Sequence, residues 1–141
     1  MNLYAESSAV LAWLLDEPRA KDVLERLAAA EVVVTSDLTL IECDRVLRRA
    51  VTLGELSEAE ASDRRAQLAA AAARWHVLRI AGEIVERARQ PFPEEPIRTV
   101  EAIHLASATL ARSAVAGLEL LSLDERVCRN GRALGFGIVP G

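Results

Sequence analysis

The chain has 141 residues, of which 51% are hydrophobic and 27% are charged. This length suits one domain with a single core, so we expect residues 1–141 to form one domain. No apolar run reaches the roughly 18 residues of a membrane helix, and the N-terminus lacks the basic and apolar regions of a secretion signal. We therefore expect a cytoplasmic protein with no membrane partner. The net charge of −4 argues against broad electrostatic binding to nucleic acid.

The first part of the chain alternates between apolar strands and helices. A short strand is predicted at Asn2–Ala5, followed by a helix at Ser7–Leu15. A second helix is predicted over Pro18–Ala30, with the proline in its first turn. A second strand follows at Val32–Thr35. Ser36 is a plausible N-cap for a long helix that runs to about Leu53.

The middle of the chain continues this alternation. A Ser-x-x-Glu capping box predicts a helix over Ser57–Arg74. A third strand is predicted at Val77–Ile80 and a helix at Gly82–Gln90. The proline-rich segment 91–96 is expected to be a rigid loop. A further helix is predicted from Thr99, as its cap, to Arg112.

The last part adds a fourth strand at Leu118–Leu123, a helix at Asp124–Leu134 and a short strand at Phe136–Val139. Short apolar strands that alternate with helices predict an α/β fold, in which helices cover both faces of a parallel sheet. The chain has no GxGxxG and no GxxxxGK[ST], so dinucleotide and P-loop nucleotide sites are unsupported. Cys43 and Cys128 have no metal-binding spacing and are expected to be buried, reduced thiols.

Four acids lie in segments that otherwise predict buried structure: Glu6, Glu42, Glu101 and Asp124. Glu6 and Asp124 directly follow predicted strands, where parallel sheets bind ligands. Acids that converge without cations repel each other, and a bound divalent metal removes this conflict. If two such ions bind, the net charge becomes −4 + 4 = 0, and local arginines could then dominate.

Each acid also has an ordinary structural explanation. Glu6 and Glu101 suit the first turns of helices, Asp124 suits an N-cap, and Glu42 could lie on a helix surface. Only their joint placement around one edge of the sheet favours a metal site. Arg98 is expected to pair with an acid or to contact a phosphate. His104, on the same helix face as Glu101, is expected to be a packed, hydrogen-bonded core residue rather than a general base.

Four segments together resemble the VapC-type toxins of the PIN-domain nucleases. The segment PFPEEPIRTVEAIHLASA at 91–108 resembles their third motif, P-x-R-T-L-D-A-I-H-L-A-T-A. MNLYAESSAVLAWLLDEP resembles their opening Y-x-D-[TS]-S-A-L, and TSDLTLIECDRVLRR resembles the second motif, whose glutamate matches Glu42. LLSLDERVCRNGRALGFGIVPG resembles their closing T-x-D-x-R-L, with Asp124 as the matching acid. Glu6 and Glu101 stand where the family usually has aspartate.

The resemblance implies a three-layer α/β/α PIN-like fold with a central parallel sheet of about five strands. It implies an endoribonuclease that hydrolyses RNA with Mg²⁺ or Mn²⁺, with the four acids as metal-ligating and catalytic residues. Ser7, Arg98 and Ser122 are lower-ranked candidates for orienting water or substrate. The resemblance also implies a VapB-like antitoxin as inhibitor, whose C-terminal segment lies across the first helices, and a homodimer.

Two other interpretations stay open. The two glutamates that replace aspartates carry one more methylene each, and this change could leave a module that binds a partner or RNA but has lost catalysis. The chain could also be a PIN nuclease of RNA processing or DNA flaps rather than a toxin, although its small size disfavours this.

Overall fold

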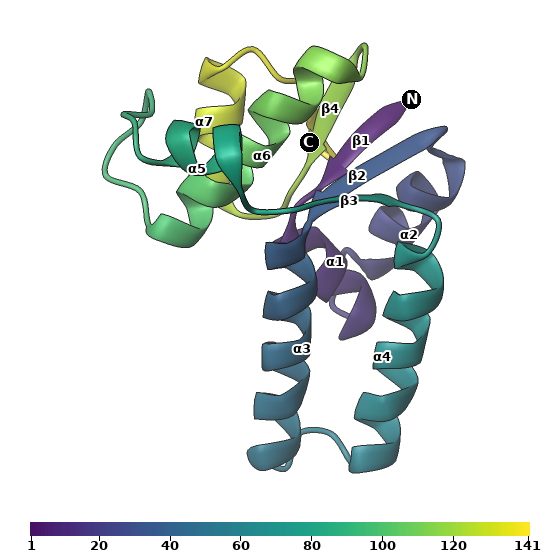
Figure 1. Ribbon diagram of the computed structural model, residues 1–141. Helices are drawn as coiled ribbons and strands as arrows, with labels where there is room; N and C mark the ends of the chain where they lie inside the picture. Colours follow the sequence, from purple (N-terminus) through teal and green to yellow (C-terminus); the bar gives the residue numbers. More distant parts are fainter.

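A computed structural model describes all residues, Met1–Gly141. Its five strands are β1 (Asn2–Ala5), β2 (Val32–Ser36), β3 (His76–Leu78), β4 (Leu118–Leu121) and β5 (Ile138–Val139). They form one sheet in the order β3-β2-β1-β4-β5, and every pairing is parallel. The first strand of the chain thus lies at the centre of the sheet, between β2 and β4 (Figure 1). The predicted parallel sheet of about five strands is confirmed.

The seven helices are α1 (Ser7–Leu14), α2 (Ala20–Ala29), α3 (Asp37–Thr52), α4 (Glu58–Ala72), α5 (Gly82–Ala88), α6 (Thr99–Ala114) and α7 (Glu125–Ala133). Helices α1–α4 lie on one side of the sheet and α5–α7 on the other, which gives the predicted three layers (Figure 1). Helices α3 and α4 pack side by side as an arm that extends away from the sheet. No helix combines the length and the apolarity that crossing a membrane requires.

The two sheet faces carry separate hydrophobic cores, because successive side chains of a strand point to opposite faces. In β1, Leu3 and Ala5 pack into the core beneath α1–α4, whereas Tyr4 packs beneath α5–α7. All three are fully buried. Burial on both faces explains why the strands are continuous apolar runs rather than alternating ones. The sheet is therefore a rigid base for residues at its carboxyl edge.

Several element ends differ from the sequence prediction. Pro18 lies in the turn before α2, which begins two residues later, so it is not in the first turn. Strand β3 ends before Ile80, because only β2 pairs with it at this edge of the sheet. Strand β4 ends before Leu123, whose backbone N–H donates to a serine side chain instead of a strand. Arg98, not Thr99, occupies the N-cap of α6.

Candidate active site

The carboxyl ends of the central strands open onto a cavity of about 550 Å³. Glu6, Glu42, Glu101 and Asp124 all line it, although they come from the end of β1, from α3, from α6 and from the loop after β4. This is the edge at which parallel α/β sheets bind ligands. The topology therefore brings together four acids that are far apart in the sequence.

Glu6 is buried, with 3% of its surface exposed, and four hydrogen bonds hold its carboxylate. Oε2 accepts from the Ser7 hydroxyl at 2.8 Å and from the Ser8 backbone N–H at 3.0 Å. Oε1 accepts from the hydroxyls of Ser8 at 2.5 Å and Ser122 at 2.6 Å. Glu6 is also the N-cap of α1, where the helix dipole stabilises a negative charge. We call these three serines the serine cradle.

Glu42 binds to a buried histidine from the opposite helical layer. His104 Nε2 lies 2.7 Å from Glu42 Oε1 and 3.7 Å from Glu6 Oε2. The other ring nitrogen, Nδ1, lies 3.2 Å from the Tyr4 hydroxyl. Burial opposes the ionisation of Glu42, but the hydrogen bond with His104 outweighs it and holds the pKa of Glu42 below its ordinary value. The prediction that His104 is a hydrogen-bonded core residue is confirmed, and its partners are two of the candidate acids.

Glu101 and Asp124 each accept a backbone hydrogen bond at the start of their own helix. Glu101 Oε1 accepts from the backbone N–H of Arg98 at 2.8 Å, which fixes the first turn of α6, and Arg126 Nη1 lies 3.8 Å away. Asp124 is the N-cap of α7, and its Oδ1 accepts from the Val127 N–H at 3.0 Å. Both acids thus fulfil the structural role that the sequence allowed, while they also line the cavity.

Of the three residues proposed to orient water or substrate, two line the cavity and the third, Ser122, does not. Ser7 and Arg98 line the cavity. The Arg98 guanidinium makes no ion pair, so the expectation that it pairs with an acid is wrong, and its charge stays free at the cavity. Ser122 donates to Glu6 and accepts from the backbone N–H of Asp124 at 3.1 Å, so it connects two of the acids.

The acids share one cavity, but they do not gather around one point. No three acidic, histidine or cysteine side chains lie in an arrangement that could hold a metal ion. The chemistry of the donors fits Mg²⁺ or Mn²⁺, because carboxylate and hydroxyl oxygens are the ligands that these ions prefer. A bound ion would require some of the carboxylates to leave their present partners.

Two contributors escaped the sequence reasoning. Ser8 donates twice to Glu6 and accepts from the Leu123 N–H at 2.9 Å, so it joins α1 to the end of β4. Arg126 approaches Glu101 from α7. Neither position carried a signal, because a serine or an arginine near a helix start is common. The contacts of His104 were partly visible, since its spacing placed it on the same face of α6 as Glu101.

Comparisons with known proteins agree with this architecture. The family model described as the PIN domain matches residues 3–133. A toxin–antitoxin complex from Klebsiella pneumoniae is similar in structure, with a TM-score of 0.63 and 21% identity, over 99% of this chain and 96% of that one. VapC20 of Mycobacterium tuberculosis, a toxin that cleaves the sarcin–ricin loop, has a TM-score of 0.63 and 19% identity, over 95% of each chain.

VapBC2 of Rickettsia felis, bound to a DNA fragment from its promoter, has a TM-score of 0.63 and 12% identity, over 98% of this chain and 97% of that one. A search of curated protein sequences gives no match. At these identities the structural likeness establishes the fold, and the family match covers nearly the whole chain. The chain belongs to the PIN-domain family.

Proposed function

We propose that this chain is the toxin of a type II toxin–antitoxin pair and an endoribonuclease that works with Mg²⁺ or Mn²⁺. The observation that carries the proposal is the single cavity lined by Glu6, Glu42, Glu101 and Asp124 at the carboxyl edge of the sheet. The free charge of Arg98 at this cavity suits a site that also receives a phosphate. The similar toxin that cleaves the sarcin–ricin loop supports RNA as the substrate class.

The chemistry divides among residues of the cavity. The four acids would hold the ion, which when bound supplies Lewis acidity and lowers the pKa of a water molecule. Hydrolysis joins the water oxygen to phosphorus and breaks one phosphate ester bond. A carboxylate of the cavity accepts the proton that the water loses, and the leaving oxygen takes up a proton from solvent. Arg98 would contact a phosphate oxygen, and Ser7 and Ser122 would orient water or substrate through their hydroxyls.

Asp124 gives the sharpest test, because asparagine keeps the capping oxygen of α7 while it removes the charge. Protein freed of any antitoxin is incubated with structured RNA and Mn²⁺. Asp124→Asn should reduce cleavage by about 100-fold or more, since a lost ligand charge weakens both the ion and its effect. The control is Glu125→Gln, the same change one residue away on a side chain that is 86% exposed. Full activity of Asp124→Asn, or cleavage that persists in EDTA, would contradict the proposal.

A second candidate is a domain that binds RNA or a partner but cleaves poorly. The observation in its favour is that each acid already has its own hydrogen-bond partner and that no three of them form a ligand set. Glu6 in particular is enclosed by the serine cradle.

The double change Glu6→Asp and Glu101→Asp separates the two candidates. Each carboxylate then retreats by one carbon–carbon bond, about 1.5 Å, toward the position usual for the family. A weakened enzyme should gain both Mn²⁺ affinity, measured by calorimetric titration, and RNA cleavage. Unchanged values would argue against the second candidate.

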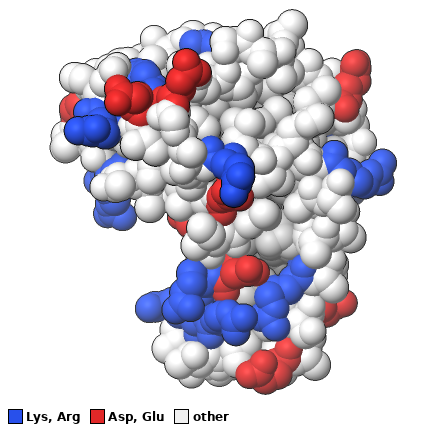
Figure 2. Space-filling model, in the orientation of Figure 1, with Lys and Arg blue, Asp and Glu red and all other residues white.

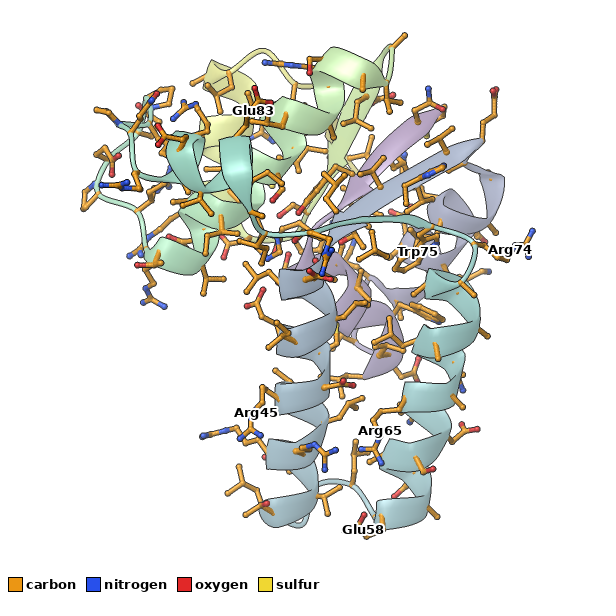
Figure 3. All side chains as sticks on the ribbon, viewed as in Figure 1. Arg45, Glu58, Arg65, Arg74, Trp75 and Glu83 are labelled. Atoms are coloured by element: carbon orange, nitrogen blue, oxygen red, sulfur yellow. The ribbon has the colours of Figure 1, made fainter.

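The partner of the proposed toxin would be a small VapB-like antitoxin, and an apolar groove of about 510 Å³ suits one of its helices. Trp13 of α1 and Leu24 of α2 line the groove together with Trp75. Figure 3 shows Trp75 just beyond the end of α4. Val10 and Val23, on the same two helices as Trp13 and Leu24, belong to the core rather than to the groove. Helix α1 connects the two hollows, because its residues Ser7, Ser8 and Leu11 line the acidic cavity while Trp13 lines the groove.

Two exposed apolar residues provide a matched test of this groove. Leu24 is 45% exposed inside it, and Val85 is 42% exposed on α5, outside it. Leu24→Glu should abolish co-purification with the proposed antitoxin, because a charge would be buried in the apolar contact. Val85→Glu should leave co-purification intact. If the two changes affect co-purification equally, the groove is not the binding site of the antitoxin.

A further inference from the structure

Helix α3 carries three free arginines on its outer surface. Arg45, Arg48 and Arg49 are exposed, and none of their guanidinium groups makes an ion pair or a hydrogen bond within the chain. They line a shallow hollow of about 440 Å³ together with Thr52 and Leu53. Figure 2 shows blue side chains gathered on the arm of α3 and α4, and in Figure 3 Arg45 points away from α4. A chain of net charge −4 thus concentrates free positive charge at one place.

The arginines continue the helix face that reaches the acidic cavity. Arg45 and Arg49 follow Glu42 by three and seven positions, which places all three on one side of α3. At 1.5 Å per residue, the arginines lie about 4.5 and 10.5 Å further along the helix axis. The charge therefore changes from negative to positive within two turns, and Arg98 adds a free positive charge at the cavity itself.

We propose that this arginine face binds the phosphates of an RNA strand next to the bond that the acidic cavity cleaves. That the bound polyanion is RNA rests on the function proposed above, whereas the positive charge of the surface is a property of α3 alone. Arginine suits the role, because its planar fork matches phosphate oxygens and its charge persists at every physiological pH. Adjacent phosphates of one strand would occupy the row of guanidinium groups, while the scissile phosphate lies at the cavity.

A second copy of the chain is a less suitable occupant of this face. In a twofold dimer the same patch meets itself, so the arginines of one α3 would face those of the other. Like charges placed opposite each other repel, and the adjacent Asp44 makes no ion pair with any of the three arginines. Charge complementarity therefore favours a polyanion.

Binding can be measured separately from cleavage. The full chain is mixed with fluorescein-labelled single-stranded RNA in EDTA, and anisotropy is recorded over a range of salt concentrations. The test variant carries Arg45→Gln, Arg48→Gln and Arg49→Gln. The control variant changes three other exposed arginines that make no ion pair, and so has the same net charge: Arg74→Gln, Arg89→Gln and Arg132→Gln.

The test variant should bind at least about tenfold more weakly. The slope of log K against log salt should fall by about 2, because each phosphate contact on a single strand contributes about 0.7. The control should stay within about twofold of the wild type. Equal weakening in both variants, an unchanged slope, or no RNA binding by the wild type would overturn the proposal.

Two further measurements distinguish RNA binding by α3 from the proposed nuclease function and from contact between copies of the chain. If the wild type binds RNA through α3 but cleaves none with Mn²⁺, the enzymatic function fails while the arginine face stands. Sedimentation velocity is run on both variants at the concentrations used for binding. If only the test variant changes its oligomeric state, the face is a contact between copies of the chain, and the RNA proposal is wrong.

Discussion

Substitution of His104 should separate the contacts of its two ring nitrogens. Glutamine can place its amide near the Nε2 position and keep the contact with Glu42, whereas asparagine reaches only the Nδ1 position and the Tyr4 hydroxyl. His104→Gln loses a neutral hydrogen bond, at a cost of about 1 kcal/mol in the free energy of unfolding. His104→Asn loses a bond to a charged group, at a cost of about 1.5–3 kcal/mol.

Urea denaturation, followed by far-UV circular dichroism, measures these free energies. The expected order of stability is wild type, then His104→Gln, then His104→Asn. Because His104 holds a proposed metal ligand, His104→Asn should also weaken Mn²⁺ binding by about 10–100-fold, and His104→Gln should largely preserve it. If the asparagine variant is as stable as the glutamine variant and binds Mn²⁺ equally well, His104 does not position Glu42.

The pH dependence provides a check on the same pair. The pKa of Glu42 is lowered in the folded protein, so its interaction stabilises the fold above the ordinary pKa of 4.5 and is lost as the pH falls through the lowered value. The stability difference between the wild type and His104→Asn should therefore be full near neutral pH and should shrink below pH 4.5. A difference that stays constant through this range would show that the lost bond is not with an ionised carboxylate.

Three further predictions concern the frame around the site. Ser57→Ala should lower stability by about 1 kcal/mol, because it removes a capping box of α4, whereas Ser62→Ala in the same helix should have little effect in urea denaturation. Gly131→Ala should cost about 1–3 kcal/mol by the same measurement, because a Cβ there would lie 2.6 Å and 2.8 Å from side chains of β4 and β5; an unchanged midpoint would contradict this packing. Burial raises the pKa of the Cys43 thiol to about 12 and also raises the pKa of Cys128, so Ellman's reagent should label neither at pH 8 before the protein unfolds.

The fold was predictable because the strands are buried on both faces. Apolar runs such as Val32–Thr35 leave little choice of structure, and the helices between them require parallel pairing. The ends of elements were less predictable, since they depend on distant partners. Strand β4 stops where Ser122 turns its side chain toward Glu6, a residue that the chain reaches 116 positions earlier.

The gathering of the four acids in one cavity was predictable from their positions after strands and at helix starts. Their individual hydrogen bonds were not. His104 lies 62 positions from Glu42, and no local pattern shows which carboxylate a buried ring will contact. The serine cradle likewise combines two neighbours of Glu6 with the distant Ser122. The local roles of Glu101 and Asp124, in contrast, follow from capping rules alone.

The central place of β1 has a consequence for protein synthesis. Asn2–Ala5 pairs with Leu118–Leu121, so the first strand made by the ribosome waits for one of the last before the sheet is complete. Glu6 and Asp124 cannot share a cavity until both have emerged. The cavity therefore cannot form in a nascent chain until Asp124 has emerged from the ribosome.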